Sequence, residues 1–592
     1  MKGLVDDKKM VDGIPIKAVV PNSTASTSSF TQAVRWIKYC DSLHKSCSSP
    51  PDSVVPKRLL DIGMNKSRFA LRVKLIETQG IEHPYVCLSH CWGAKTLPCL
   101  TTEENYDEHL EGIAWEAFPR TFQDAILFSR KLQMRYLWID SLCIVQNDKL
   151  DWASEASNMS SIYRGAYVTI AATSSEDSTY GLFQEASTQL YDAHSLKISD
   201  SVLGESLIRF RRKLPHFSIS SPLARPRNTA AQFPLLQRAW AYQERLLSSR
   251  ILHFTANELV WECLEASSCQ CSQRTEPFYF EGSDVKEATR QDPKLSYASL
   301  VTTISSRSDS SQDTHGVSED TQREIIFSQW QDFVREYSKL NLTVQKDKLS
   351  ALSGLAQQFN NDFRVTGKYI AGLWSADLER GLLWRLPPEK LRDPRPAVWR
   401  APSFSWASVE GQVDYPPYAE ARDYGYPLST DPIPFVDILG ISTVPLHGDI
   451  FGELATASLS ILGPTVDAII TYDPRSTEKR GIDFKLNVEG GQVSEFYVDY
   501  SVHNVSDDHH IDSGEVVKCL RLRHLDFKQK VLSLVLKQVE PNICVYSRIG
   551  IAIEESQGEE IRPLLERKDR RREMLAGKWP VYHGMLEVLT II

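Results

Sequence analysis

Reactive and polar side chains follow two short apolar runs in the first third of the sequence. After the runs at 85–88 and 136–139 come a hydroxyl, an imidazole, an indole, a carboxylate and a thiol: Ser89, His90, Trp92, Asp140 and Cys143. A thiol, an imidazole and a carboxylate within reach of one another could serve as nucleophile, base and orienting group in hydrolysis. Cysteine is also common in buried strands, and the residues around these three match no hydrolase motif. A reactive role and simple packing are therefore both open for Cys143.

One acidic residue stands out in the helix predicted at 151–163. At about 100° per residue, Glu155 lies beside Met159 in the apolar stripe that also contains Trp152. Burial disfavours the charged form, so this carboxylate must either find a partner or have a raised pKa. A carboxylate in that situation is a candidate catalytic group. Alternatively, Glu155 lies at the edge of the stripe and pairs with Arg164 or with backbone N–H groups near the helix start.

The elements that would position these side chains alternate between strand and helix. Three strands and two helices are expected, in the order 85–89, 120–132, 136–139, 151–163 and 167–172. Such alternation predicts βαβ units and an α/β domain with a doubly wound parallel sheet. In sheets of this kind ligands bind beyond the carboxyl ends of the strands, which is where Ser89 and Asp140 would lie.

Composition and charge restrict the class of protein. The 592 residues include 67 Lys and Arg against 76 Asp and Glu, and 42% of them are apolar, which is typical of a soluble globular protein of several domains. The acidic balance argues against nucleic acid as a partner. No apolar run is long enough for a transmembrane helix, and the N-terminus lacks the apolar region of a secretory signal, so we expect no membrane association. An odd number of cysteines, 11, indicates reduced thiols in an intracellular protein.

Changes in composition along the chain predict five segments. They are a mobile arm and short helix at 1–56, the α/β domain at 57–275, a linker or surface insertion at 276–320, a helical segment at 321–400 and a β-rich domain at 401–592. The last assignment depends on short alternating or β-branched runs, such as those at 457–462 and 531–535.

Two further groups of residues allow two interpretations each. Cys40, His44 and Cys47 are spaced i, i+4 and i+7 on one helix face, which would suit zinc, but three ligands without a fourth favour packing, and we predict no metal site. Glu244 and Arg245 could line a site near Trp240, or could pair with other charges across the domain.

Several motifs, in the expected order, resemble the fungal heterokaryon-incompatibility (HET) domain. They are Tyr85–Gly93 (YVCLSHCWG), Phe118–Ile126 (FPRTFQDAI), Tyr136–Gln146 (YLWIDSLCIVQ) and, as a closing element, Arg238–Ser248 (RAWAYQERLLS). Segments at 347–354, 369–374 and 401–408 are similar to ones that recur in long fungal proteins with this domain. A departure is His90, where the family more often has Tyr. The resemblance implies a cytoplasmic protein that acts with protein partners in non-self recognition and triggers growth arrest or programmed cell death.

The region around Glu155 is also similar to Toll/interleukin-1-receptor (TIR) domains. These place a Trp-x-x-Glu arrangement at the start of a helix, as Trp152 and Glu155 do here, and some of them hydrolyse NAD with that Glu. This second resemblance implies a TIR- or flavodoxin-like fold, Glu155 as the catalytic carboxylate, NAD as a substrate and no resident cofactor. A carboxylate there could stabilise the oxocarbenium charge that develops when the nicotinamide–ribose bond breaks. The alternative is a non-enzymatic module that acts by self-association as a homo-oligomer or by recruiting partners.

Overall fold

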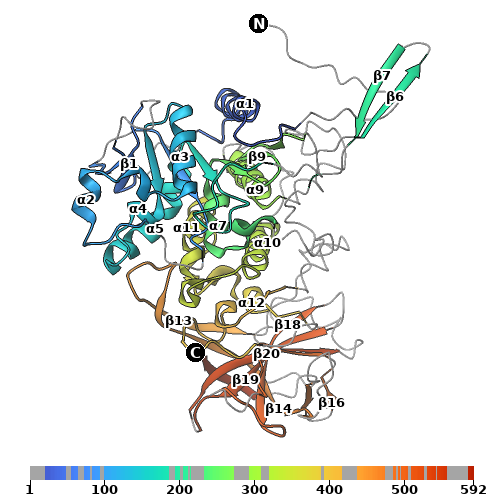
Figure 1. Cartoon of the computed structure of the whole chain (residues 1–592). Coiled ribbons are helices and arrows are strands. Elements are labelled where there is room, and N and C mark those ends of the chain that lie inside the picture. The colour runs from blue at the N-terminus through green and yellow to red at the C-terminus, as the bar shows by residue number, and fades with distance from the viewer. Residues whose placement is uncertain are drawn as a thin grey trace. The chain divides into compact units, whose positions relative to one another are not determined.

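The computed structural model divides into two compact units, Met1–Asp309 and Ser310–Ile592 (Figure 1). The structure describes residues 20–48, 55–64, 72–79, 83–93, 99–185, 194–200, 204–210, 214, 232–271, 292–308, 319–387, 393–415, 436–473, 484–488, 491–493, 495–503, 509–525, 530–541, 543–555 and 585–592. Among these residues, no helix combines the length and the apolar character needed to cross a membrane.

An eight-stranded sheet forms the centre of the first unit. Its strands are β1 (Arg58–Asp61), β2 (Lys74–Glu77), β3 (Tyr85–Ser89), β4 (Tyr136–Ile139), β5 (Val168–Ala171), β8 (Arg250–Phe254), β9 (Leu259–Cys263) and β10 (Ser267–Cys269), in the order β10-β9-β8-β5-β3-β4-β1-β2. The four central strands β8, β5, β3 and β4 are parallel to one another. A separate two-stranded ribbon consists of β6 (His194–Asp200) and β7 (Gly204–Phe210).

Antiparallel outer strands flank the parallel strands that the sequence predicts. Strands β1 and β2 on one side, and β9 and β10 on the other, run antiparallel to their neighbours. Between β8 and β9 the chain turns within four residues, where the Thr255 hydroxyl donates to the Glu258 carbonyl at 2.7 Å. A connection this short can only reverse the chain, whereas parallel neighbours need a crossover of a dozen residues or more. The sheet is therefore mixed, with a parallel centre.

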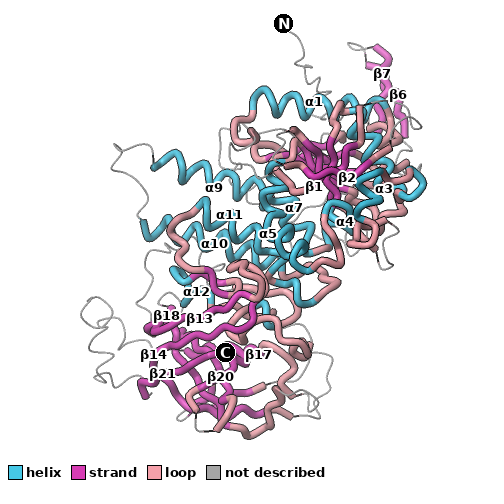
Figure 2. Tube along the Cα trace, turned by 90° about the vertical axis from the view of Figure 1, so that its left-hand side faces the viewer, coloured by secondary structure: helices cyan, strands magenta, loops and turns pink. Residues whose placement is uncertain are grey.

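Helices connect the parallel strands and flank the sheet (Figure 2). Helix α3 (Arg120–Lys131) connects β3 to β4, α5 (Lys149–Gly165) connects β4 to β5, and α7 (Ala239–Leu247) precedes β8; shorter helices are α2 (Tyr106–Glu111) and α4 (Asp140–Cys143). Because the crossovers through α3 and α5 run in opposite directions along the sheet, right-handed connections place these helices on opposite faces. The strand order therefore reverses between β3 and β5, and this is the switch point at which doubly wound sheets bind ligands.

Helix α1 (Thr27–Leu43) belongs to the first unit. Ser26 caps it by accepting a hydrogen bond from the Ser29 N–H at 3.0 Å, and Ala33 and Trp36 join the core of the sheet domain. Phe30 contacts Phe128 of α3 edge to face, with ring centroids 5.6 Å apart. This helix lies within the segment 1–56, for which the sequence predicts a mobile arm and a short helix.

The predicted linker at 276–320 contains a helix in its described part. Helix α9 (Pro293–Ser308) buries Lys294, whose ammonium donates to the carbonyl of Arg245 at 2.7 Å and to that of Ser248. These bonds satisfy carbonyl groups at the end of α7, so α9 packs against α7 within the first unit.

The second unit contains the helical segment and the β-rich domain. Its helices are α10 (Glu319–Tyr337), α11 (Ser350–Asp362) and α12 (Leu378–Gly381), and its small two-stranded sheet is β11 (Tyr369–Ile370) with β12 (Leu373–Trp374). Nine strands form the large sheet: β13 (Asp437–Pro445), β14 (Leu454–Thr471), β15 (Lys485–Val488), β16 (Gly491–Gln492), β17 (Glu495–Val498), β18 (Val516–Leu525), β19 (Lys530–Gln538), β20 (Val545–Glu555) and β21 (Met585–Ile591). This architecture confirms the predicted α/β class with a helical segment and a β-rich C-terminal part.

Aromatic side chains, among them Trp374 and Trp406, fill the helical part of the second unit. Both are buried, and the indole N–H groups of Trp330 and Trp406 donate to the Gly372 carbonyl at 2.9 and 3.1 Å. Gly372 has φ of +93°, and a Cβ at this position would lie 2.5 Å from the Trp406 indole nitrogen. Glycine is therefore required here, both by backbone conformation and by the space the indole occupies.

Candidate functional site

A serine and a glutamate meet at the switch point of the first unit's sheet. Ser89 is the last residue of β3, and its hydroxyl donates a hydrogen bond to Oε2 of Glu244 on α7. Ser89 is 2% exposed and Glu244 is 6% exposed. The two residues are 155 positions apart in the chain, and they meet because α7 packs on α5 beside the carboxyl ends of the parallel strands. This pair occupies the position at which doubly wound sheets bind their ligands.

The carboxyl group of Glu244 titrates close to neutral pH. Burial raises its pKa to about 7, and the nearby charge of Asp140 acts in the same direction. Hydrogen bonds from Ser89 and Tyr163 and the positive charge of Arg238 oppose this rise. A group whose pKa lies near the working pH can both donate and accept a proton efficiently, which is the requirement for general acid–base catalysis.

This raised pKa predicts that Glu244 reduces stability as the pH increases. The folded state binds the Glu244 proton more tightly than the unfolded state, whose pKa is near 4.5, so stability falls as the pH rises from about 4.5 to about 7. Relative to wild type, Glu244→Gln should gain up to roughly 3 kcal/mol in the free energy of unfolding between about pH 5 and about pH 8. Urea unfolding of both proteins at several pH values measures this difference. A difference that does not change with pH would contradict the assignment.

Asp140 and Trp92 lie beside this pair at the end of β4. The Trp92 indole N–H donates to Oδ2 of Asp140 at 2.8 Å, and the Ser141 backbone N–H donates to Oδ1 at 2.7 Å. The Asp140 side chain is 20% exposed, so the carboxyl end of β4 remains open to solvent. These contacts hold the carboxylate in one orientation at the strand end.

His90 is buried and neutral at physiological pH. Burial lowers its pKa to about 4, although the Asp140 carboxylate, 3.7 Å from Nδ1, acts in the opposite direction. The ring packs edge to face on Phe122 at 4.9 Å, and neither ring nitrogen has a hydrogen-bond partner among the described residues. Arg238 donates to the His90 carbonyl at 2.7 Å, which places a half-buried guanidinium beside the strand end.

Cys143 has the properties of a packed thiol. It is fully buried, and burial raises its pKa to about 12, so the thiol stays protonated at neutral pH. No hydrogen bond connects it to His90 within the described part of the chain. A nucleophilic cysteine needs its thiolate form and a base within reach, so the environment of Cys143 counts against the hydrolase interpretation.

Glu155 is buried on α5, as its place in the apolar stripe predicts. It is 2% exposed, and its Oε2 has no hydrogen-bond partner among the described residues. Burial raises its pKa, whereas the charges of Arg58 and Lys57 lower it. Arg58 is itself paired with Asp151 and donates to the Cys143 carbonyl at 2.7 Å. Glu155 therefore lies near the Arg58–Asp151 ion pair. Ser89 and Asp140 lie instead near the carboxylate of Glu244.

The two tryptophans that start α5 and α7 are in contact. The rings of Trp152 and Trp240 lie edge to face at 6.2 Å, and both are only partly buried. This contact connects the first turn of α5 to the helix that carries Glu244.

Sequence reasoning left the roles of Glu244 and Arg245 open, and the structure separates them. Arg245 makes two hydrogen bonds of 2.7 Å to the Glu262 carboxylate, so its charge is neutralised inside the core. Glu244 contacts the Ser89 hydroxyl. The available signal was an acidic residue in a helical segment that contains six apolar residues among its nine, but its partner could not be predicted from spacing.

Cys40 lies on α1, whereas His44 and Cys47 follow the end of that helix at Leu43, so the three residues do not share one helix face as their spacing predicts. Cys40, His44 and Cys47 gather around Cys263, the last residue of β9. Cys263 pairs with Arg250, the first residue of the parallel strand β8, so this group lies at the amino ends of the parallel strands. It is therefore distinct from the Ser89–Glu244 pair.

A comparison with protein families identifies this domain. A family model described as "Heterokaryon incompatibility protein (HET)" matches residues 85–244. The chain carries a HET domain. The matched range begins with β3 and ends at Glu244, so both members of the Ser89–Glu244 pair lie within it, which confirms the resemblance in the sequence. Neither the curated proteins nor the solved structures include a significant match to the chain.

Proposed function

We propose that the HET domain hydrolyses the bond between nicotinamide and ribose in NAD, and that the resulting loss of NAD stops growth in heterokaryon incompatibility. The observation that supports this best is the buried Glu244, which is bonded to Ser89 at the switch point and has a pKa of about 7. Nucleotides and other ligands bind at this position in doubly wound sheets.

The chemistry requires a carboxylate and a water molecule. The C1′–N bond breaks with its electron pair moving to the nicotinamide nitrogen, and positive charge develops on the ribose ring. The Glu244 carboxylate, in a buried environment, stabilises that charge. Water then adds to C1′ as Glu244 accepts one of its protons, and the products are nicotinamide, ADP-ribose and a proton.

Groups around the pair suit a dinucleotide. The Arg238 guanidinium carries a fixed positive charge of the kind that binds phosphate in two-point hydrogen bonds. The contacting rings of Trp152 and Trp240 offer aromatic faces for a base or for the nicotinamide ring. His90, whose ring nitrogens have no partner among the described residues, would accept a hydrogen bond from a ribose hydroxyl.

The test is direct. Purified full-length protein is incubated with NAD, and nicotinamide and ADP-ribose are separated and quantified over time. We expect the two products in equal amounts, with a rate proportional to protein concentration or rising more steeply if self-association is needed. NAD that stays intact at the highest protein concentration, with and without a crowding agent, would contradict the proposal.

Growth of a fungal host separates this activity from a non-enzymatic role. If the HET domain acts by hydrolysis, expression of wild type should stop growth and lower cellular NAD, and Glu244→Gln should do neither at equal protein level. Growth arrest by Glu244→Gln with normal NAD would instead favour the module that acts by self-association or recruitment.

A further inference from the structure

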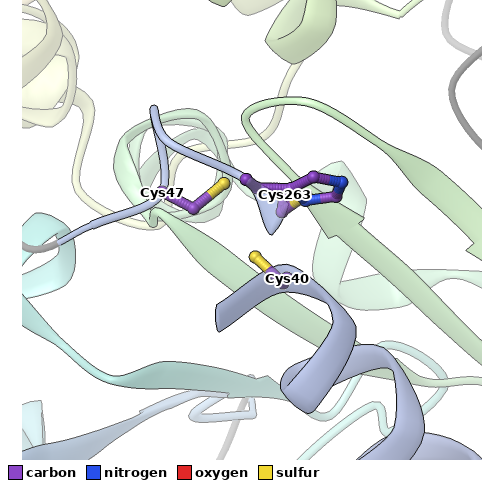
Figure 3. A group of neighbouring side chains, drawn as sticks. Cys40, Cys47 and Cys263 are labelled. Carbon is purple, nitrogen blue, oxygen red and sulfur yellow. The ribbon is translucent and has the colours of Figure 1, made fainter. Parts of the chain in front are cut away.

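Four metal-binding side chains meet where the end of α1 approaches the end of β9. The sulfur atoms of Cys40, Cys47 and Cys263 and a ring nitrogen of His44 all lie within 4.8 Å of one another, and all four residues are buried. Figure 3 shows the sulfur atoms of Cys40 and Cys47 turned toward Cys263. Nδ1 of His44 is 3.2 Å from the sulfur of Cys263, a residue 219 positions away in the chain.

We propose that Cys40, His44, Cys47 and Cys263 bind one zinc ion. Tetrahedral zinc has Zn–S bonds of about 2.3 Å and Zn–N bonds of about 2.0–2.1 Å, which places neighbouring ligand atoms about 3.5–3.8 Å apart. A cluster whose ligand atoms all lie within 4.8 Å of one another closes to this geometry with small side-chain movements. Three thiolates and one imidazole suit zinc, and a closed set of four protein ligands is typical of a structural site.

Neighbouring groups stabilise the thiolates that zinc requires. The Arg250 guanidinium donates to the sulfur of Cys40 at 3.3 Å and forms an ion pair of 2.7 Å with Asp41. The backbone N–H of Glu265, two residues after Cys263, also donates to the Cys263 sulfur. Such outer contacts orient metal ligands and balance charge, here the single negative charge of a Zn²⁺ ion with three thiolates.

Zinc binds cysteine as the thiolate, so metal binding at this cluster would release the protons of its thiols.

The site has a structural consequence for the domain. It would connect α1 to the antiparallel side of the sheet and close a loop of more than 200 residues, and cross-links over long loops restrict the unfolded chain most. Because this cluster lies at the amino ends of the parallel strands, zinc here would stabilise the domain without contacting Ser89 or Glu244.

Metal analysis of the full-length protein tests the site. We expect purified wild type to contain zinc, and Cys263→Ser to contain about one zinc ion per chain less, because that residue supplies the ligand from the distant strand. The matched control is Cys519→Ser, which changes a buried cysteine of the second unit and should leave the zinc content unchanged.

Cobalt exchange on wild type keeps the test valid if Cys263→Ser does not fold. Zinc-depleted wild type titrated with Co²⁺ should develop, at one equivalent, the visible and sulfur-to-metal absorption of a tetrahedral cobalt–thiolate centre. The proposal is overturned if wild type contains no stoichiometric metal and gives no such absorption. It is equally overturned if mass spectrometry of the native protein finds a disulfide between any two of Cys40, Cys47 and Cys263.

Discussion

Glu244→Gln is expected to reduce the rate of NAD hydrolysis by about 100-fold or more, since positioned general acid–base groups typically contribute 10²–10⁴-fold. Glutamine has nearly the same size and can still accept the hydrogen bond from the Ser89 hydroxyl. It cannot become negatively charged or accept a proton from water, so the variant loses the two properties that the reaction needs. The measurement is nicotinamide release per chain at pH 7.

Glu155→Gln is the matched comparison, because it changes a second buried carboxylate on a helix of the same domain. The structure predicts a smaller loss for this variant than for Glu244→Gln, since Ser89 and Asp140 lie with Glu244. A large loss in Glu155→Gln with full activity in Glu244→Gln would return the catalytic role to Glu155, as the TIR resemblance implies. Circular dichroism and thermal melting of both variants exclude misfolding as the cause.

Arg548→Met is expected to destabilise the second unit by about 3–5 kcal/mol, the usual effect of leaving one partner of a buried ion pair without the other. Arg548 is fully buried, and its Nε donates to Oδ2 of Asp499 at 2.8 Å. Its two terminal nitrogens donate to the carbonyls of Leu382 at 2.6 Å and Trp384 at 2.5 Å, and the guanidinium lies over the Trp384 ring at 3.6 Å. One side chain thus connects strand β20 to the segment that follows α12.

A second substitution distinguishes loss of the ion pair from loss of packing. In Arg548→Met with Asp499→Leu, the buried carboxylate is also removed, so much of the lost stability should return. Lys530→Met is the control for a partly exposed pair, with Glu495 at 2.7 Å, and should cost no more than about 1 kcal/mol. Equal unfolding free energies for wild type and Arg548→Met in urea titrations would show that the pair has no role in stability.

Local patterns in the sequence predicted the elements around the site well. The apolar runs and helical spacing between 85 and 172 correspond to β3, α3, β4, α5 and β5 with boundaries that differ by one or two residues. These elements depend on side-chain periodicity, which a single sequence displays directly. The antiparallel outer strands were not predicted, because pairing direction depends on how short a connection is and on which strand is the neighbour.

The residues that complete each site come from distant parts of the chain. Ser89 was predicted at the strand end, but its partner Glu244 arrives on a helix 155 positions later. Cys40, His44 and Cys47 were recognised as three ligands, but the fourth, Cys263, lies on β9. Helical and strand periodicity contain no information about such contacts, since these depend on the order of strands in the sheet.

Glu155 illustrates the limit of a pattern read on one element. Its place in the apolar stripe left open either burial with a raised pKa or a partner at the edge of the stripe, and the structure has it buried with a raised pKa. The same stripe could not show that Arg58 and Asp151 would be its neighbours, or that a second buried carboxylate would contact Ser89. Burial of an acidic residue marks a candidate, and the groups around it decide between candidates.

The pH dependence of nicotinamide release tests the central claim most directly, namely that Glu244 is a carboxyl group titrating near neutrality at the catalytic centre. For wild type, the rate at low NAD concentration should rise with an apparent pKa near 7 as Glu244 loses its proton. For Glu244→Gln, the rate should stay near background and show no such transition between pH 5 and pH 9. A variant that retains both the wild-type rate and the wild-type pH profile would contradict the account.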